Sequence, residues 1–160
     1  KLRFEIRLEH PITGELENFA DTGFGCSQVL PVLVGGFKAA AGSIFLVQQP
    51  ELHLHPGAQA ELGDFFLRLY ENQVQTFVET HSEHLLLRVQ GLVAEGKIDP
   101  DRVRIYYVHP TEHGKSVVKI GLGDGAEFLD AWPAGFFPER LVEARRILKG
   151  PRRREAGRST

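Results

Sequence analysis

The chain has 160 residues, 42% hydrophobic and 25% charged, which is the composition of an ordinary globular protein with one substantial core. A formal net charge of -2 excludes a general attraction to nucleic acid or anionic membranes, and no apolar run approaches the ~20 residues of a membrane helix. The single cysteine excludes an internal disulfide, and with no signal peptide in the sequence we expect a cytoplasmic protein that has no membrane partner.

The first part of the chain predicts a strand, a turn, a loop and a helix before a second strand. Residues 1–9 alternate apolar and charged side chains, the period of a half-buried strand, and residues 10–18 contain turn residues that predict a turn or hairpin. Small residues over 21–27 precede an apolar stretch that predicts a helix, capped by Ser27 and lying against a sheet. Residues 44–47 are apolar and predict a buried strand.

The second part continues the alternation. Apolar residues at three- and four-residue spacing predict a helix over 56–70, and residues 74–79 predict a short strand. A second helix is predicted over 82–95, and residues 102–109 and 116–120 predict a hairpin. The order strand, helix, strand, helix, strand predicts an α/β fold with a largely parallel sheet flanked by helices, plus a β-hairpin.

A loop of small residues precedes the first predicted helix. Gly23 and Gly25 let backbone N–H groups approach an anion. Ser27 and Gln28 fall at the start of the predicted helix, where the helix dipole favours negative charge. The loop therefore predicts a contact with phosphate, although a tight turn that only caps a helix would use the same residues.

Polar residues follow the predicted strand at 44–47. The apolar run stops at Gln48 and Gln49, and a proline and Glu51 come next. Ligands of open α/β sheets bind at the carboxyl ends of the strands. This strand end is therefore a candidate site.

The second predicted strand ends in Thr80 and His81. A histidine here can donate a hydrogen bond near neutral pH and can change its charge with its surroundings. Taken alone, such a histidine would be a surface residue beside the next helix. Its place in register with the two other loops makes it a third candidate for the same site.

In this order the segments resemble ABC-type predicted ATPases related to the overcoming-lysogenization-defect (OLD) proteins. Residues 23–28 resemble the signature loop, which these ATPases write Gly-x-Gly-x-Ser-Gln. Residues 48–56 resemble the Walker B and D-loop segment. In the family this segment begins with an acid, continues with an acid or glutamine, and ends in Pro-Glu-x-His-Leu-His-Pro. Residues 80–81 resemble the H-loop. The run 132–140 resembles the ending of one subgroup, so the resemblance covers about residues 19–148.

The resemblance implies a P-loop NTPase-like (ABC ATPase) layered fold, of which this chain would be the C-terminal half. It also implies that the signature loop reaches the γ-phosphate of ATP held by an opposite subunit, and hence a head-to-tail homodimer. The residues of this loop that would bind ATP are Gly23, Gly25, Ser27 and Gln28. Closure of the dimer would be passed to an effector protein or to DNA, both by analogy only.

For the strand ends, the resemblance implies ATP and Mg²⁺ as cofactors. Gln48 falls on the Mg²⁺ position, which is acidic in the family, and Gln49 falls on the adjacent catalytic position. A neutral amide can bind metal-bound water, but it lacks the charge that draws a divalent cation. Glu51 is the nearest remaining carboxylate, and His81 would sense the γ-phosphate. The catalytic set would thus be Gln48, Gln49, Glu51 and His81.

The sequence contains no Gly-x-x-x-x-Gly-Lys-Ser/Thr phosphate loop; the Gly-Gly-Phe-Lys at 35–38 lies in a helix-like stretch. We therefore expect the Walker A motif in a preceding segment and residues 1–148 to be the C-terminal part of an ATPase domain. Residues 149–160 are basic and predict a disordered, solvated tail. ATP hydrolysis would belong to the full-length protein, and the isolated chain would neither bind ATP tightly nor hydrolyse it.

Two alternatives stay open. With Gln48 in place of an acid, the loops could close around ATP without turnover, which would make the protein a nucleotide-gated clamp or scaffold. A zinc site is the other alternative, because imidazole is a good zinc ligand and the motifs hold four histidines. These are His53, His55, His81 and His84. The spacing of the histidines does not by itself supply a ligand set.

Overall fold

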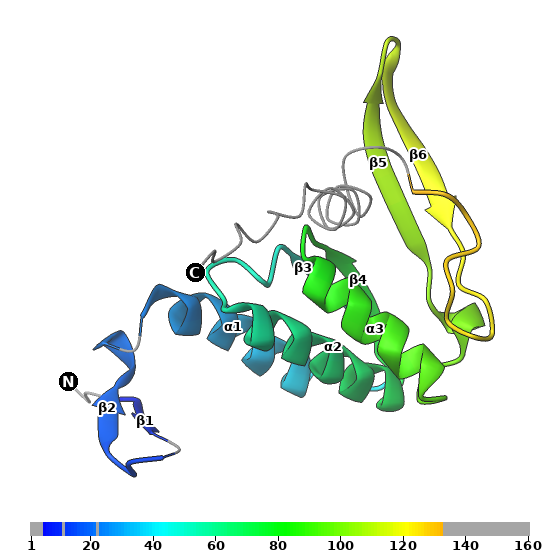
Figure 1. The fold of residues 1–160 in the computed structure, drawn as a ribbon. Helices are drawn as coiled ribbons and strands as arrows, with labels where there is room; N and C mark the ends of the chain where they lie inside the picture. Colours follow the sequence, from blue (N-terminus) through cyan, green and yellow to red (C-terminus); the bar gives the residue numbers. More distant parts are fainter. Residues whose placement is uncertain (1–4, 11, 22, 133–160) are drawn as a thin grey trace, which may run out of the picture. The chain divides into compact units, whose positions relative to one another are not determined.

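The computed structural model describes residues 5–10, 12–21 and 23–132 of the chain (Figure 1). Within that part, no helix is both long enough and apolar enough to span a membrane. The resemblance beyond Trp132 and the predicted basic tail at 149–160 lie outside the described residues.

The chain divides into two compact units, which are residues 1–103 with 122–127, and residues 104–121 with 128–160. The first unit begins with a small antiparallel hairpin of β1 (Arg7–Glu9) and β2 (Leu16–Asn18), in which Arg7 pairs with Asn18. A short 3₁₀ helix, η1 (Phe19–Asp21), follows. The predicted hairpin is confirmed, and of the strand predicted over 1–9 the structure describes only residues 7–9 as β1.

Helix α1 (Phe24–Lys38) begins three residues before the predicted start. Its N-cap is Gly23, with φ 93° and ψ 161°, so the prediction that Ser27 caps the helix is wrong. A backbone with this φ suits glycine and few other residues, which is why the chain enters the helix at Gly23. Gly25 is already helical and lies against the next loop: a Cβ on Gly25 would stand 2.5 Å from the carbonyl oxygen of His53.

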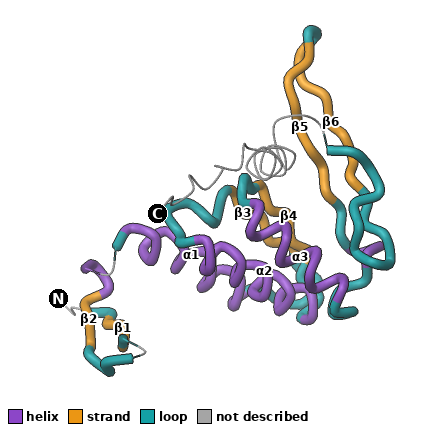
Figure 2. Tube along the Cα trace, viewed as in Figure 1, coloured by secondary structure: helices purple, strands orange, loops and turns teal. Residues whose placement is uncertain are grey.

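The centre of the first unit is a strand–helix–strand–helix run, as predicted. It consists of β3 (Ile44–Gln48), α2 (Pro56–Glu71), β4 (Gln75–Glu79) and α3 (Glu83–Ala94). Strands β3 and β4 are parallel and in register from Ile44 beside Gln75 to Gln48 beside Glu79. Figure 2 shows this pair of short strands together with the helices of the same unit. The α/β fold class, with a parallel strand pair, flanking helices and a β-hairpin, is confirmed.

The core of this unit lies on one face of the strand pair. Phe65 and Leu69 of α2 and Val74 form a buried cluster. The partly buried residues packed on the cluster are Val32, Leu33, Ala39, Phe45 and Phe66. Burying these side chains supplies the main driving force for joining α1, α2 and the strands.

The opposite face of the strand pair is exposed. Ile44, Leu46 and Phe77 keep 61%, 73% and 51% of their surface exposed. The strand predicted at residues 44–47 is therefore confirmed, but its predicted burial is wrong, because Phe45 and Val47 are only partly buried and the other two residues are exposed. The apolar run resembled that of a strand covered on both faces, whereas the described residues cover only one face.

Helices α2 and α3 approach each other closely. A Cβ on Gly63 would lie 2.7 Å from Cγ of Arg88, so glycine makes room for that side chain. The Arg88 guanidinium donates two hydrogen bonds to the Asp64 carboxylate, from Nε to Oδ2 at 2.8 Å and from Nη2 to Oδ1 at 2.6 Å. The hydrogen bonds from Arg88 lower the pKa of the Asp64 carboxyl below its ordinary value.

The short 3₁₀ helix η2 (Pro100–Arg102) follows α3 in the first unit and precedes the hairpin of the second unit in the sequence. Strands β5 (Ile105–Thr111) and β6 (Gly114–Ile120) are antiparallel, with Ile105 opposite Ile120. The predicted hairpin over 102–109 and 116–120 is confirmed, with strands that extend closer to the turn.

Candidate functional site

The carboxyl ends of β3 and β4 bring two polar side chains together. Gln48 and Glu79 are partners in the strand register, and Nε2 of Gln48 donates to Oε2 of Glu79 at 2.7 Å. Both side chains are exposed. The sequence prediction included Gln48 but missed Glu79. No motif in the sequence pointed to Glu79, because only the register of the two parallel strands shows that their last residues lie side by side.

The residue after this pair has a strained backbone. Gln49 has φ 46°, in the left-handed region that residues other than glycine seldom occupy. Its N–H donates to the carbonyl oxygen of Glu79 at 2.7 Å, which holds it on the end of β4. Strained residues that the surrounding structure holds in place are common at functional sites, so the geometry is consistent with the predicted role of Gln49.

Glu51 connects the two strand ends. Its side chain is only 6% exposed, and Oε1 accepts a hydrogen bond from the backbone N–H of His81 at 2.7 Å. Oε2 is also buried, and it has no hydrogen-bond partner among the described residues. Glu51 is therefore a buried carboxylate that fixes the backbone at His81, while the His81 side chain itself is exposed.

A second set of hydrogen bonds joins the same two loops. Gln59 of α2 donates from Nε2 to the carbonyl oxygen of Leu54 at 2.9 Å and accepts from Oγ of Ser82 at 2.7 Å. Ser82 also caps α3 by accepting from the N–H of Leu85 at 3.1 Å. The segments after β3 and after β4 are thus held together by side chains as well as by the strand pairing.

The predicted signature loop lies beside the segment that follows β3. Besides the close approach of Gly25 to His53, the ring of Phe24 packs edge-on against the His53 ring, with centroids 5.0 Å apart. No side chain caps the N-terminus of α1 among the described residues. Free N–H groups and the helix dipole at such an end favour an anion, so Gly23 and Gly25 lie where a phosphate could be bound.

Ser27 and Gln28 are placed differently from the prediction. Both lie inside α1 and are exposed, rather than in a loop before it. Within the described residues, no hydrogen bond joins either of them to the strand ends. Their part in binding phosphate stays a prediction.

The four histidines do not form a metal centre in the described part of the chain. No group of three or more histidine, cysteine, aspartate or glutamate residues is arranged to hold a metal there. His55 instead caps α2, since its Nδ1 accepts from the N–H of Gly57 at 3.2 Å. The zinc alternative thus finds no ligand set in these residues.

The donors at the strand ends fit Mg²⁺ better. Mg²⁺ prefers oxygen ligands and is held in nucleotide sites by one or two carboxylates together with phosphates and water. Gln48 offers an amide oxygen, Glu79 offers a carboxylate, and both are accessible. These residues could hold Mg²⁺ in the presence of a nucleotide.

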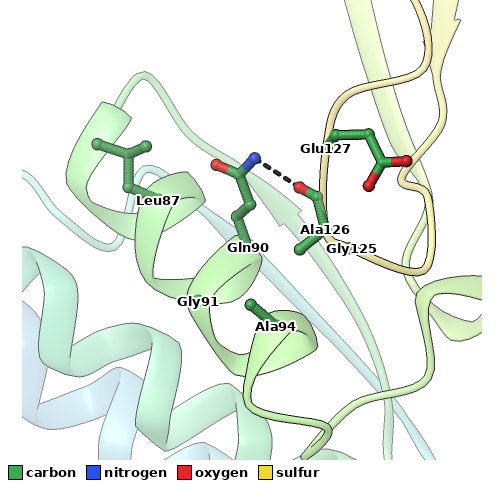
Figure 3. Close-up of a pocket in the computed structure, with 7 residues that line it drawn as sticks. All are labelled: Leu87, Gln90, Gly91, Ala94, Gly125, Ala126 and Glu127. Atoms are coloured by element: carbon green, nitrogen blue, oxygen red, sulfur yellow. Dashed lines mark hydrogen bonds between the residues drawn. The ribbon is translucent and has the colours of Figure 1, made fainter.

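A pocket of about 340 Å³ lies elsewhere in the first unit, between α3 and the turn at 123–127 (Figure 3). Gln90 is one of the residues that line it, and its Nε2 donates to the carbonyl oxygen of Ala126 at 2.6 Å. Ala126 has φ 62° and is 3% exposed, so the turn is tightly packed against the helix. None of the predicted site residues lines this pocket.

A parallel strand pair flanked by helices, with a glycine at a helix N-terminus and polar strand ends, is an α/β arrangement of the kind that P-loop NTPases have. Residues 5–88 match the family described as AAA domain, putative AbiEii toxin, Type IV TA system. The chain belongs to this family. No curated protein matches the sequence.

Comparison with solved structures supports the same fold. A similar structure comes from work on the structural biochemistry of ATP-driven dimerization and DNA-stimulated activation of SMC ATPases. The TM-score is 0.55 at 16% sequence identity, and the match covers 88% of this chain and 72% of the other. At this identity the likeness is evidence of fold alone.

Proposed function

We propose that this chain is the C-terminal lobe of an OLD-like ATPase of ABC type, which binds and hydrolyses ATP with Mg²⁺. The observation that carries the proposal is the hydrogen bond that links the two strand ends: the backbone N–H of His81 donates to Oε1 of Glu51 at 2.7 Å. This bond and the strand pairing bring residues 48–51 and residues 79–81 to one edge of the strand pair, and we assign these residues to the Walker B and H-loop segments. A nucleotide contacting that edge would meet Gln48, Gln49 and His81 together.

The uncapped N-terminus of α1 supports the dimeric part of the proposal. Its N–H groups can receive a phosphate, and the resemblance assigns that phosphate to ATP bound by the opposite subunit. A head-to-tail homodimer in the cytoplasm, with a Walker A motif elsewhere in the gene product, completes each site. The similar structure comes from work on ATP-driven dimerization and DNA stimulation, so DNA or an effector protein is the proposed partner.

The test uses the complete gene product and His81→Ala. Turnover of ATP should fall by about a hundredfold or more, within the range for a group that acts on the reacting phosphate or its proton. The matched control is His113→Ala, which removes a histidine from the turn of the β5–β6 hairpin. Equal turnover by His81→Ala and the unaltered protein would contradict the proposal.

One observation favours a second function. Gln48 stands where the family has an acid, so the loops could close on ATP without hydrolysing it. The protein would then be a nucleotide-gated clamp or scaffold. Gln48→Glu in the complete gene product separates the two functions: turnover that appears only in this variant supports the clamp.

A further inference from the structure

The carboxylate that β3 lacks is present on the neighbouring strand. Glu79 is the last residue of β4, as Gln48 is of β3, and the two are direct partners in the parallel register. Their side chains touch through the 2.7 Å bond from Nε2 of Gln48 to Oε2 of Glu79. A negative charge therefore lies one hydrogen bond away from the position where the family places its acid.

This charge is available to a cation. None of the ion pairs among the described residues includes Glu79, and its side chain is exposed. The hydrogen bond from Gln48 occupies one carboxylate oxygen and leaves the carboxylate charge in place. An exposed carboxylate beside an amide oxygen matches the oxygen ligands that Mg²⁺ prefers, and bound phosphates would supply the remaining ligands.

We infer that Glu79 supplies the Mg²⁺-binding carboxylate of this ATPase, in place of the acid missing at Gln48. The inference rests on the proposed ATP site and specifies its metal ligand. It also accounts for how a chain with glutamine at the Walker B position could retain metal-dependent turnover, because the charge is displaced to β4 and is not lost. Gln48 then orients Glu79 and can contact a metal-bound water.

The test measures the binding of Mn²⁺, a spectroscopic substitute for Mg²⁺, to the complete gene product with a non-hydrolysable ATP analogue. Electron paramagnetic resonance gives the Mn²⁺ dissociation constant. Glu79→Gln keeps the size of the side chain and an acceptor for Gln48, and it should weaken Mn²⁺ binding by at least about 10- to 100-fold, the loss typical even of residues that only support a metal ligand. The double variant Gln48→Glu/Glu79→Gln moves the charge back to β3 and should restore binding.

Glu71→Gln is the matched control. Glu71 is exposed at the end of α2, which leads to the start of β4 and so lies at the opposite edge of the strand pair. Its substitution should leave Mn²⁺ binding unchanged. Unaltered Mn²⁺ binding in Glu79→Gln, with the ATP analogue still bound, would overturn the inference alone. Failure of the unaltered gene product to bind the analogue would overturn the proposed function itself.

Discussion

The helix layer and the strand ends of the first unit follow opposite principles. In the α2–α3 layer, Leu92 has no exposed surface, Leu85 is 3% exposed, and Arg88 pairs with Asp64 through two hydrogen bonds. At the strand ends, Gln49 has a left-handed backbone and Glu51 keeps a buried oxygen without a partner among the described residues. The polar side chains named in the helix layer therefore have hydrogen-bond partners, whereas the strand ends keep a strained backbone and a polar atom without a partner in the described part of the chain.

The difference indicates where the stability of the unit resides. Strained backbone and unpaired buried polar atoms each cost free energy, and they persist only if well-packed neighbours compensate. We therefore expect substitutions in the helix layer to destabilise the unit without a specific effect on nucleotide chemistry. Substitutions at the strand ends should impair chemistry and can even increase stability.

The largest effect is expected at Leu92. Leu92→Ala removes a fully buried side chain and should lower the free energy of unfolding by about 2–5 kcal/mol. Leu87→Ala makes the same change on the same helix at a side chain that is 43% exposed. Urea denaturation should show a much smaller loss for Leu87→Ala, and equal losses would contradict the assignment of the core.

A smaller effect is expected at Gly36. A Cβ there would lie 2.3 Å from Cζ of Phe65, a buried ring, so Gly36→Ala should cost about 1–3 kcal/mol through overpacking. A Cβ on Gly91, within α3, would meet nothing closer than Nη1 of Arg88 at 3.8 Å.

Gly91→Ala should therefore stabilise the unit by up to about 1 kcal/mol, because alanine favours helix more than glycine does. Thermal denaturation of the two variants should shift the midpoint in opposite directions. A higher midpoint for Gly36→Ala would show that α1 does not pack on α2 as described.

Much of the secondary structure could be predicted from the sequence, since periodicity and turn residues identify local elements well. The alternation of strands and helices and the hairpin at 105–120 were predicted correctly. The start of α1 was not, because Ser27 is a good capping residue in general, whereas the helix begins after Gly23, whose φ of 93° is a backbone conformation that the sequence does not reveal.

The site was predictable only in part, for a similar reason. Motif order indicated Gln48, Gln49 and His81, but motifs run along one segment and carry no information about cross-strand partners. Glu79 could have been found only from the strand register, and the bond from Glu51 to the backbone of His81 joins residues 30 apart in the sequence. The exposed face of β3 also depends on what covers it, which apolar composition does not reveal.

At Gln49 we expect a substitution to increase stability. Gln49→Gly should relieve the left-handed strain and increase the free energy of unfolding by about 0.5–1 kcal/mol, after the greater chain entropy of glycine is subtracted. The same variant should lower ATP turnover by the complete gene product, since Gln49 is one of the proposed catalytic residues.

The control for Gln49 is Gln73, which has φ 60° in the turn before β4. Gln73→Gly should give a similar gain in stability and leave turnover unchanged, because it lies at the opposite edge of the strand pair. A loss of turnover in both variants would show that the effect of Gln49→Gly is not local to the site.

The smallest effect concerns acid sensitivity in the helix layer. The pKa of Asp64 is lowered mainly by its hydrogen bonds with Arg88, and the pKa of Glu95 is lowered first by Lys97 and then by Arg88. A carboxyl whose pKa is lower in the folded state stabilises the fold fully above the pKa of the unfolded chain, about 4 for aspartate. That contribution is lost as the pH falls through the lower, folded pKa.

Stability measured by urea denaturation should therefore decline below about pH 4, and Asp64→Asn should make the decline shallower. Both side chains of the Asp64–Arg88 pair are partly exposed, so added salt should weaken the effect. Glu61→Gln, on the same helix and outside the ion pairs of the described residues, should leave the slope unchanged. An identical pH dependence in Asp64→Asn and the unaltered protein would mean that Arg88 joins α2 and α3 by packing alone. The helix layer would then depend on packing, in still sharper contrast with the charged strand ends.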